Sequence, residues 1–263
     1  MKRFLTIALA VCTLALPGLI LLAGCPPPHP DSGLKAAIVD QLAILEPNQD
    51  FTSQVTAELE ACGFEVDVYS GEEVNVKLYR QLPKYGYKLI IFRAHAGLLK
   101  AEENSEVVGV KRATYLFTAE EYSQMKYVRE QLDDQLLPAE MTADFPLVFA
   151  VNSNFIMEKM EGRFDDTVII MTGCSCLYLE DMAAAFTLKG ASTYLGWDGS
   201  VDLGYVDQAA AGLITSLCTG GMTVGEAVAE IAPDPVWGAG LKFYPQESGG
   251  KTIGELIGVG NGE

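Results

Sequence analysis

The stretch VIIMTGCSC, Val168–Cys176, joins an apolar run to two thiols that stand one residue apart. A short, continuous apolar run bounded by a turn signal indicates a strand that is covered on both faces, as in a parallel sheet. We therefore predict a core strand at Thr167–Met171. The thiols that follow it, Cys174 and Cys176, could form a disulfide, hold a metal, pack in the core or supply a nucleophile, and the surrounding sequence has to distinguish these roles.

A second apolar run lies upstream at Tyr87–Phe92, YKLIIF. It too predicts a strand that is buried on both faces. The run continues into Arg93–Gly97, RAHAG, which contains His95. Each of these two predicted core strands is thus followed directly by a side chain that can take part in catalysis, a thiol in one case and an imidazole in the other.

The first half of the chain alternates strand and helix patterns at short spacing. Further strands are predicted at Lys35–Leu42 and Phe64–Tyr69, and a helix at Glu72–Tyr85. A second helix is predicted from four residues that recur on one helical face before Gly63, namely Phe51, Val55, Leu59 and Cys62. Three strands joined by two helices indicate an α/β fold whose sheet is parallel, with right-handed crossovers.

The second half is less regular before the pattern returns. Glu106–Thr118 resembles a hairpin or extended insertion, Ala119–Leu137 a polar surface helix, and Pro146–Phe155 another extended segment. After the strand at Thr167–Met171 we expect a helix, a strand and two more helices, at Tyr178–Leu188, Ala191–Trp197, Gly204–Leu217 and Thr223–Ile231. The predicted α/β domain covers residues 34–231, and the Gly- and Pro-rich tail at 232–263 is assigned to no domain.

The N-terminus has the composition of a secretory leader. Lys2 and Arg3 precede an apolar run, and residues 22–25, LAGC, are similar to the bacterial lipobox. That resemblance implies cleavage after residue 24, so that Cys25 carries acyl chains and holds the protein on a cell membrane, outside the cytoplasm. An uncleaved membrane anchor is the alternative. Residues 25–33 then form a proline-rich spacer.

Composition excludes several partners. The formal net charge is −17, and loss of Lys2 and Arg3 with the leader makes it −17 − 2 = −19. This charge repels nucleic acid, and no basic cluster interleaved with aromatic residues is found. The first strand is followed by no Gly-rich phosphate loop. A zinc site needs three or four ligands, so a Cys-x-Cys with one distant histidine falls short, and we expect no metal and no cofactor.

Four cysteines remain once Cys12 and Cys25 are assigned to the leader and the lipid. They are Cys62, Cys174, Cys176 and Cys218. One disulfide is compatible with a compartment outside the cytoplasm, but its connectivity cannot be read from the sequence. A bridge between Cys174 and Cys176 would be strained because the two residues are so close in the chain.

His95 and Cys174 should leave the same edge of one sheet, because parallel strands end on the same side. A thiol is mostly protonated at neutral pH, so a nearby histidine that generates the thiolate would make it a nucleophile. Gly97 and Gly173 permit backbone amides to approach a developing oxyanion. The alternative is a structural histidine and a packed thiol.

These features together resemble the caspase-like cysteine peptidases, clan CD, which include metacaspases, gingipains and clostripain. The resemblance rests on an apolar strand that ends in His and small residues, a later strand that ends in Gly-Cys-Ser, and the segment KGASTYLGW at 189–197. It covers roughly residues 36–231. It implies a three-layer sandwich of caspase-like topology with a mostly parallel sheet.

The same resemblance assigns roles to individual residues. Cys174 would be the nucleophile, His95 the general acid and base, and the amides of Cys174 and of the Ala96-Gly97 turn the oxyanion hole. The carboxyl end of the first strand contributes to the substrate pocket in this fold. Asp40, or the rival Asp198, would there bind a Lys or Arg side chain of a peptide or protein substrate.

The sequence therefore predicts a lipid-anchored cysteine peptidase that cleaves peptide bonds outside the cytoplasm. A lipoprotein that keeps the fold as a binding or sensing module is the main alternative. That alternative is favoured by Ala96, which stands where the family usually has glycine, and by the neighbouring Cys176. A substrate-binding lipoprotein with two lobes is a third, weaker reading.

Overall fold

The computed structural model describes residues 33–99 and 113–259. The predicted leader, the lipidated Cys25 and nearly all of the spacer lie outside the described residues. Within those residues no helix is long and apolar enough to cross a bilayer.

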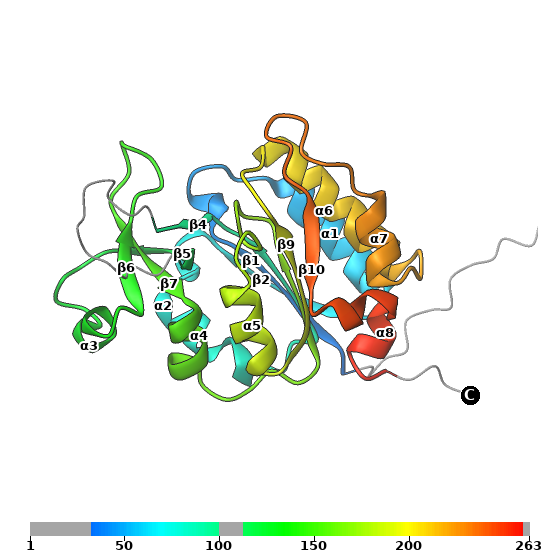
Figure 1. Cartoon of the computed structure of the whole chain (residues 1–263), viewed down its shortest axis with the longest axis horizontal. Helices are drawn as coiled ribbons and strands as arrows, with labels where there is room; N and C mark the ends of the chain where they lie inside the picture. The colour runs from blue at the N-terminus through cyan, green and yellow to red at the C-terminus, as the bar shows by residue number, and fades with distance from the viewer. Residues whose placement is uncertain (1–32, 100–112, 260–263) are drawn as a thin grey trace, which may run out of the picture.

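The molecule is built on a six-stranded sheet (Figure 1). The strands, in spatial order, are β10 (Leu241–Tyr244), β9 (Ala191–Trp197), β8 (Thr167–Met171), β3 (Leu89–Arg93), β1 (Lys35–Asp40) and β2 (Glu65–Ser70). All pairs are parallel except that of β10 with β9. Every residue of β3 and β8 is buried, as their continuous apolar sequences predict.

Helices cover both faces of this sheet, which confirms the predicted three-layer α/β class (Figure 1). One face packs against α1 (Gln49–Ala61), α6 (Leu203–Cys218), α7 (Val224–Glu230) and α8 (Ile253–Leu256). The other packs against α2 (Val76–Gln81), α4 (Ser153–Lys159) and α5 (Asp181–Leu188). Short 3-10 turns complete the layers at Leu42–Ile44, Gly71–Glu73, Leu82–Lys84 and Gln246–Gly250.

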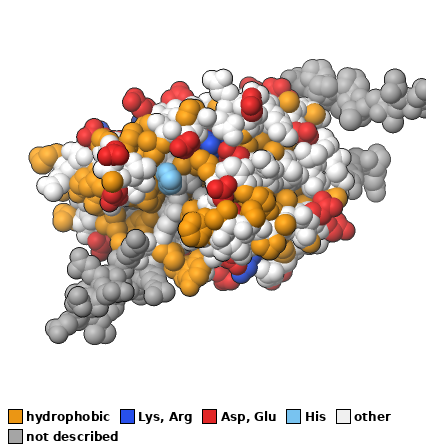
Figure 2. All heavy atoms as spheres, turned by 90° about the horizontal axis from the view of Figure 1, so that it is seen from above, with side chains coloured by type: hydrophobic (Ala, Val, Ile, Leu, Met, Phe, Trp, Pro, Cys, Tyr) orange, Lys and Arg blue, Asp and Glu red, His pale blue; other side chains and the backbone are white. Residues whose placement is uncertain are grey.

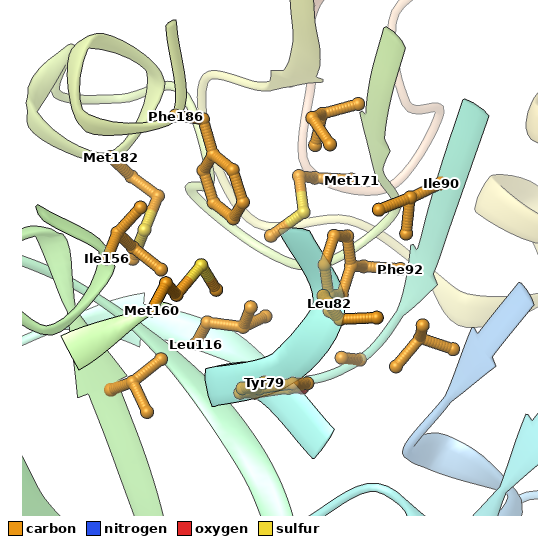
Figure 3. Packing of buried hydrophobic residues seen from close by; sticks show 14 of the residues in the cluster. Tyr79, Leu82, Ile90, Phe92, Leu116, Ile156, Met160, Met171, Met182 and Phe186 are labelled. Carbon is orange, nitrogen blue, oxygen red and sulfur yellow. The ribbon is translucent and has the colours of Figure 1, made fainter. Parts of the chain in front are cut away.

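Alternate residues of the central strands point to opposite helical layers. Figure 3 shows Phe92 of β3 and Met171 of β8 in the layer that contains Phe186 of α5. The Phe92 ring lies 5.8 Å from that of Tyr79 and 6.0 Å from that of Phe186. Full burial of a side chain of this size stabilises the fold by about 1.5–3 kcal/mol. The strands that end at the candidate site are therefore firmly held.

A second, antiparallel sheet lies between β3 and β8 in the chain. Its order is β4 (Ala96–Leu98), β5 (Thr114–Glu121), β7 (Val148–Asn152) and β6 (Leu136–Ala139). The predicted surface helix at Ala119–Leu137 is wrong. Only α3 (Val128–Leu132) is helical there, because Tyr127 and Asp134 adopt positive φ at either end and pairing with β7 keeps β5 extended to Glu121.

Part of the segment predicted to be an unassigned tail belongs to the main sheet. Residues 241–244 form the edge strand β10, which pairs with β9 from Leu241 to Tyr244. The Ser248 hydroxyl lies 2.8 Å from that of Thr193 and fixes the turn that follows. Glycine and proline here shape turns around a strand of only four residues, which is too short to be recognised in a Gly-rich composition. The main sheet therefore continues beyond residue 231, where the sequence predicts the domain to end.

Candidate active site

His95 and Cys174 line one small cavity at the ends of β3 and β8. The cavity has a volume of about 70 Å³, and its lining residues are Leu42, Ala94, His95, Thr172, Gly173, Cys174, Val201, Leu203 and Val206. Both side chains are half-buried. Viewed from above in Figure 2, a pale blue histidine side chain reaches the surface among hydrophobic neighbours. The structure thus brings together the two residues that the sequence selected.

Gly173 allows this close approach of the two strand ends. A Cβ atom at Gly173 would lie 2.3 Å from the carbonyl oxygen of Ala94 and 3.1 Å from the backbone nitrogen of Ala96. Both neighbours belong to the segment that carries His95. The backbone before Cys174 therefore packs directly against the backbone around His95, with no room for a side chain.

Gly173→Ala should destabilise the protein by about 2–3 kcal/mol, because overpacking against fixed backbone forces the strand ends apart. Urea unfolding followed by Trp fluorescence measures the change. Gly212→Ala is the matched control, since Gly212 is exposed in α6 and its added Cβ meets nothing within 4 Å. That control should stabilise by up to about 1 kcal/mol. Equal stability of Gly173→Ala and wild type would contradict the close approach.

The turn that presents Cys174 is held by the last residue of β9 and by the segment that follows β9. The Ser175 amide donates to the carbonyl of Gly199 at 2.8 Å, and the Leu177 amide donates to that of Trp197 at 2.8 Å. The Val201 amide lies 3.5 Å from the Cys174 sulfur and donates to it. Ser175 adopts a φ of 54°, a left-handed conformation that turns the chain sharply after Cys174.

Cys176 has a different environment from Cys174. It is fully buried, and its thiol donates to the carbonyl of Gly173 at 3.0 Å. Burial, with a smaller contribution from Cys174, raises the pKa of Cys176 well above that of an ordinary thiol. A protonated, inaccessible thiol cannot act as a nucleophile, so Cys176 has a packing role.

His95 is fixed through its backbone. Its amide donates to Oε1 of Gln41 at 2.9 Å, its carbonyl accepts from the Phe117 amide at 3.0 Å, and its ring lies 6.0 Å from the Phe117 ring. Burial lowers the pKa of His95 below 6.5. The imidazole is therefore neutral at pH 7, the form that can accept a proton.

The predicted oxyanion amides are not equivalent. Backbone hydrogen bonds join His95 to Phe117 and Leu99 to Ala113, and the register between β4 and β5 places Gly97 opposite Tyr115. Hydrogen-bonded pairs alternate along an antiparallel ladder. The Gly97 amide therefore faces β5, whereas the Ala96 amide faces away from it, toward the Gly173 backbone. The amides of Ala96 and Cys174 are therefore better placed than that of Gly97 to donate to an oxyanion.

Asp40 does not face a substrate pocket, contrary to the expectation from the resemblance. Its side chain is only 4% exposed, and Oδ1 accepts hydrogen bonds from Arg93 Nη1 at 2.9 Å and from the Ala43 amide at 3.0 Å. Burial raises the pKa of Asp40, and the Arg93 charge only partly offsets this effect. Its cationic partner comes from β3 of the same chain.

Arg93 and Asp207 complete a buried charge cluster that sequence reasoning missed. Arg93 donates from Nε and Nη2 to the two carboxylate oxygens of Asp207, at 2.9 and 3.0 Å, and is 1% exposed. Asn48, which caps α1, also donates to Asp207 at 2.8 Å. Burial alone would lower the pKa of Arg93, but the bonds and charges of Asp207 and Asp40 raise it. The sequence did contain one indication of this cluster: Arg93 directly follows the apolar residues of a predicted core strand, where a charged side chain needs a buried partner.

Asp198 lies in the turn after β9 and is also paired within the chain. Its carboxylate forms an ion pair with Lys242 of β10 at 2.7 Å and accepts from the Gly240 amide at 2.7 Å. Burial raises the pKa of Asp198, but Lys242 and the Gly240 amide outweigh it and lower the pKa. The side chain is 28% exposed. A basic substrate would compete with Lys242 for it.

A larger groove of about 600 Å³ adjoins His95 on the second sheet. It is lined by Gly97, Leu98, Leu99, Tyr115, Phe117, Leu137, Pro138, Ala139, Glu140, Met141 and Ala150. Gln41 connects it to the site, because Gln41 binds the His95 amide through Oε1 and Met141 Sδ through Nε2, the latter at 2.8 Å.

The described residues hold no group of three or more His, Cys, Asp or Glu side chains arranged to bind a metal ion. Comparison with known proteins finds no family model and no curated protein that matches this chain.

Proposed function

We propose that this protein is a cysteine peptidase, anchored to a cell membrane by lipid on Cys25 and acting outside the cytoplasm. Cys174 is the nucleophile and His95 is the general acid and base. The observation that carries the proposal is the shared cavity: the only described histidine and a half-buried thiol line the same space at the ends of adjacent parallel strands. The strand order, with only the edge strand antiparallel, is compatible with caspase-like topology.

The proposed reaction transfers the acyl group of a peptide to the thiol and then to water. Neutral His95 accepts the Cys174 proton as sulfur attacks the carbonyl carbon. The amides of Ala96 and Cys174 stabilise the oxyanion. His95 then gives its proton to the departing amine, and water hydrolyses the thioester with His95 again as base. No described side chain hydrogen-bonds to the imidazole, so this is a dyad rather than a triad.

The groove beside His95 supports a peptide as the substrate. Its volume of about 600 Å³ can hold several side chains, and Glu140 is the only charged side chain among the described residues that line it. We therefore propose that apolar side chains of the substrate occupy the groove. Asp198 remains the candidate for a Lys or Arg preference, whereas Asp40 is withdrawn from that role because Arg93 already neutralises it.

A binding or sensing module without activity is the second candidate. The cavity at the dyad, about 70 Å³, is small, and Ala96 stands where the family usually has glycine. Both observations are compatible with a protein that keeps His95 and Cys174 but whose cavity cannot accommodate a peptide bond for cleavage.

The test is a panel of quenched fluorescent peptides, offered to the full chain in detergent under reducing conditions. The panel varies the residue on each side of the bond among Arg, Lys, Asp, Leu and Phe. We expect cleavage of at least one peptide and its loss after iodoacetamide modifies Cys174. Failure to cleave any peptide would contradict the peptidase and favour the binding module.

The pH dependence of cleavage should report on His95. Protonated imidazole cannot accept the thiol proton, so activity falls as the pH drops through the pKa of His95. Burial lowers that pKa, so the acidic limb of kcat/KM should have its midpoint below 6.5. Circular dichroism at each pH checks that the fold persists. A midpoint at or above 6.5 would show that His95 is not buried as described.

A further inference from the structure

Two half-buried thiols lie far from the candidate active site, at the ends of neighbouring helices. Cys62 caps the C-terminus of α1, where its amide donates to the carbonyls of Glu58 and Leu59, and Cys218 is the last residue of α6. The two helices pack side by side on one face of the sheet (Figure 1). Both thiols pack against the same apolar core. Because α1 runs back from the carboxyl end of β1, they lie at the opposite edge of the sheet from Cys174.

Cys62 and Cys218 lie at the ends of two packed helices, and their side chains interact. This interaction lowers the pKa of Cys62 and, with burial, raises that of Cys218. A disulfide requires the two Cβ atoms to be about 3.5–4.5 Å apart and a sulfur–sulfur bond of about 2.0 Å. Two thiols that interact across the ends of packed helices, against one apolar core, are placed to form such a bond.

We propose that Cys62 and Cys218 form a disulfide that ties the end of α1 to the end of α6. The inference rests on the location outside the cytoplasm proposed above, where disulfides persist. The other two thiols are unsuited to a bridge. Cys176 is fully buried with its thiol bonded to Gly173, and a bridge to Cys174 across one residue would be strained.

The bond forms by exchange with an external disulfide, such as oxidised glutathione or an oxidoreductase disulfide. The Cys62 thiolate attacks one sulfur, a mixed disulfide forms, and the first external thiol leaves. Cys218 loses its proton and attacks the Cys62 sulfur, which releases the second external thiol. Two protons and two electrons pass from the protein thiols to the external disulfide, which becomes two thiols.

Peptide mapping of the full chain tests the bond directly. The protein is incubated with oxidised glutathione, alkylated with iodoacetamide under denaturing conditions and digested. We expect a linked pair of peptides that contain Cys62 and Cys218, about 2 Da lighter than the two reduced peptides, with Cys174 and Cys176 alkylated. Alkylation at all four positions, or a link that involves Cys174 or Cys176, would overturn the proposal.

Thermal unfolding supplies a second measurement. The bond spans 218 − 62 = 156 positions, so reduction should lower the Tm of the oxidised wild type by at least about 5 °C. Cys62→Ser and Cys218→Ser should each show the same Tm with and without reductant. A reductant effect of wild-type size in either variant refutes the assignment. The rate of peptide cleavage by Cys62→Ser should equal that of wild type. If the wild type forms the Cys62–Cys218 disulfide but cleaves no peptide, the peptidase proposal fails and the disulfide proposal stands.

Discussion

We expect Cys174→Ala to abolish the proposed peptide cleavage, with a loss in kcat/KM of roughly 10⁴-fold or more. Alanine cannot form the thioester, and no other described nucleophile lines the cavity that contains His95 except the hydroxyl of Thr172, which is buried and donates to the Phe92 carbonyl. The fold should survive, because the hydrogen bonds of the half-buried sulfur with described residues are two weak ones, both to the Val201 backbone. Initial rates on the best peptide of the panel measure the loss, and urea unfolding measures stability.

Cys176→Ser is the matched control. Its hydroxyl can keep the hydrogen bond to the Gly173 carbonyl, so cleavage should stay within a few-fold of wild type. A folded Cys174→Ala protein that still cleaves would remove Cys174 as the nucleophile. A folded Cys176→Ser protein as inactive as Cys174→Ala would contradict the distinction between the two thiols.

Arg93→Met destabilises the protein by about 3–5 kcal/mol, the largest stability effect that we expect. Methionine fills much of the same volume but leaves the carboxylates of Asp40 and Asp207 buried without a cation. Removal of one partner from a buried charge cluster costs far more than the net contribution of the cluster, since the remaining charges cannot regain water. Urea unfolding at pH 7, followed by circular dichroism, measures the loss.

The pH dependence of this loss separates buried charge from packing. Without Arg93 the pKa of Asp40 in the folded state should rise further above its ordinary value of 3.8. The folded variant then binds more protons than the unfolded chain, so the deficit relative to wild type shrinks as the pH falls toward 4. A deficit that does not change with pH would assign the effect to packing.

Asp207→Asn provides the control for the cluster. It leaves Arg93 paired with Asp40 and removes one of two negative charges, at the cost of one misdirected amide hydrogen bond toward Arg93 or Asn48. We expect a loss of about 1–2 kcal/mol, clearly smaller than that of Arg93→Met. A larger loss would show that the cluster depends on Asp207 more than on its cation.

Sequence reasoning succeeded where the signal is local. The runs at 87–92 and 167–171 became β3 and β8, because a strand covered on both faces must be apolar throughout. It failed at Ala119–Leu137, where polar residues favoured a helix but pairing between β5 and β7 decided the structure. The local sequence does not show which distant segment a strand will pair with. An edge strand of four residues, such as β10, is too short to give a recognisable pattern.

By itself the sequence determined the mostly parallel α/β sheet and placed His95 and Cys174 at the same edge of it, since apolar runs and the polar residues that follow them can be read directly. Tertiary structure alone decided which residues serve that site. In the folded chain Cys176 is buried, whereas Cys174 lines a cavity. Asp40 pairs with Arg93, and Arg93 also binds Asp207 of α6, which lies 114 residues further along the chain. The reason is physical: burial and charge pairing depend on groups that only folding brings together.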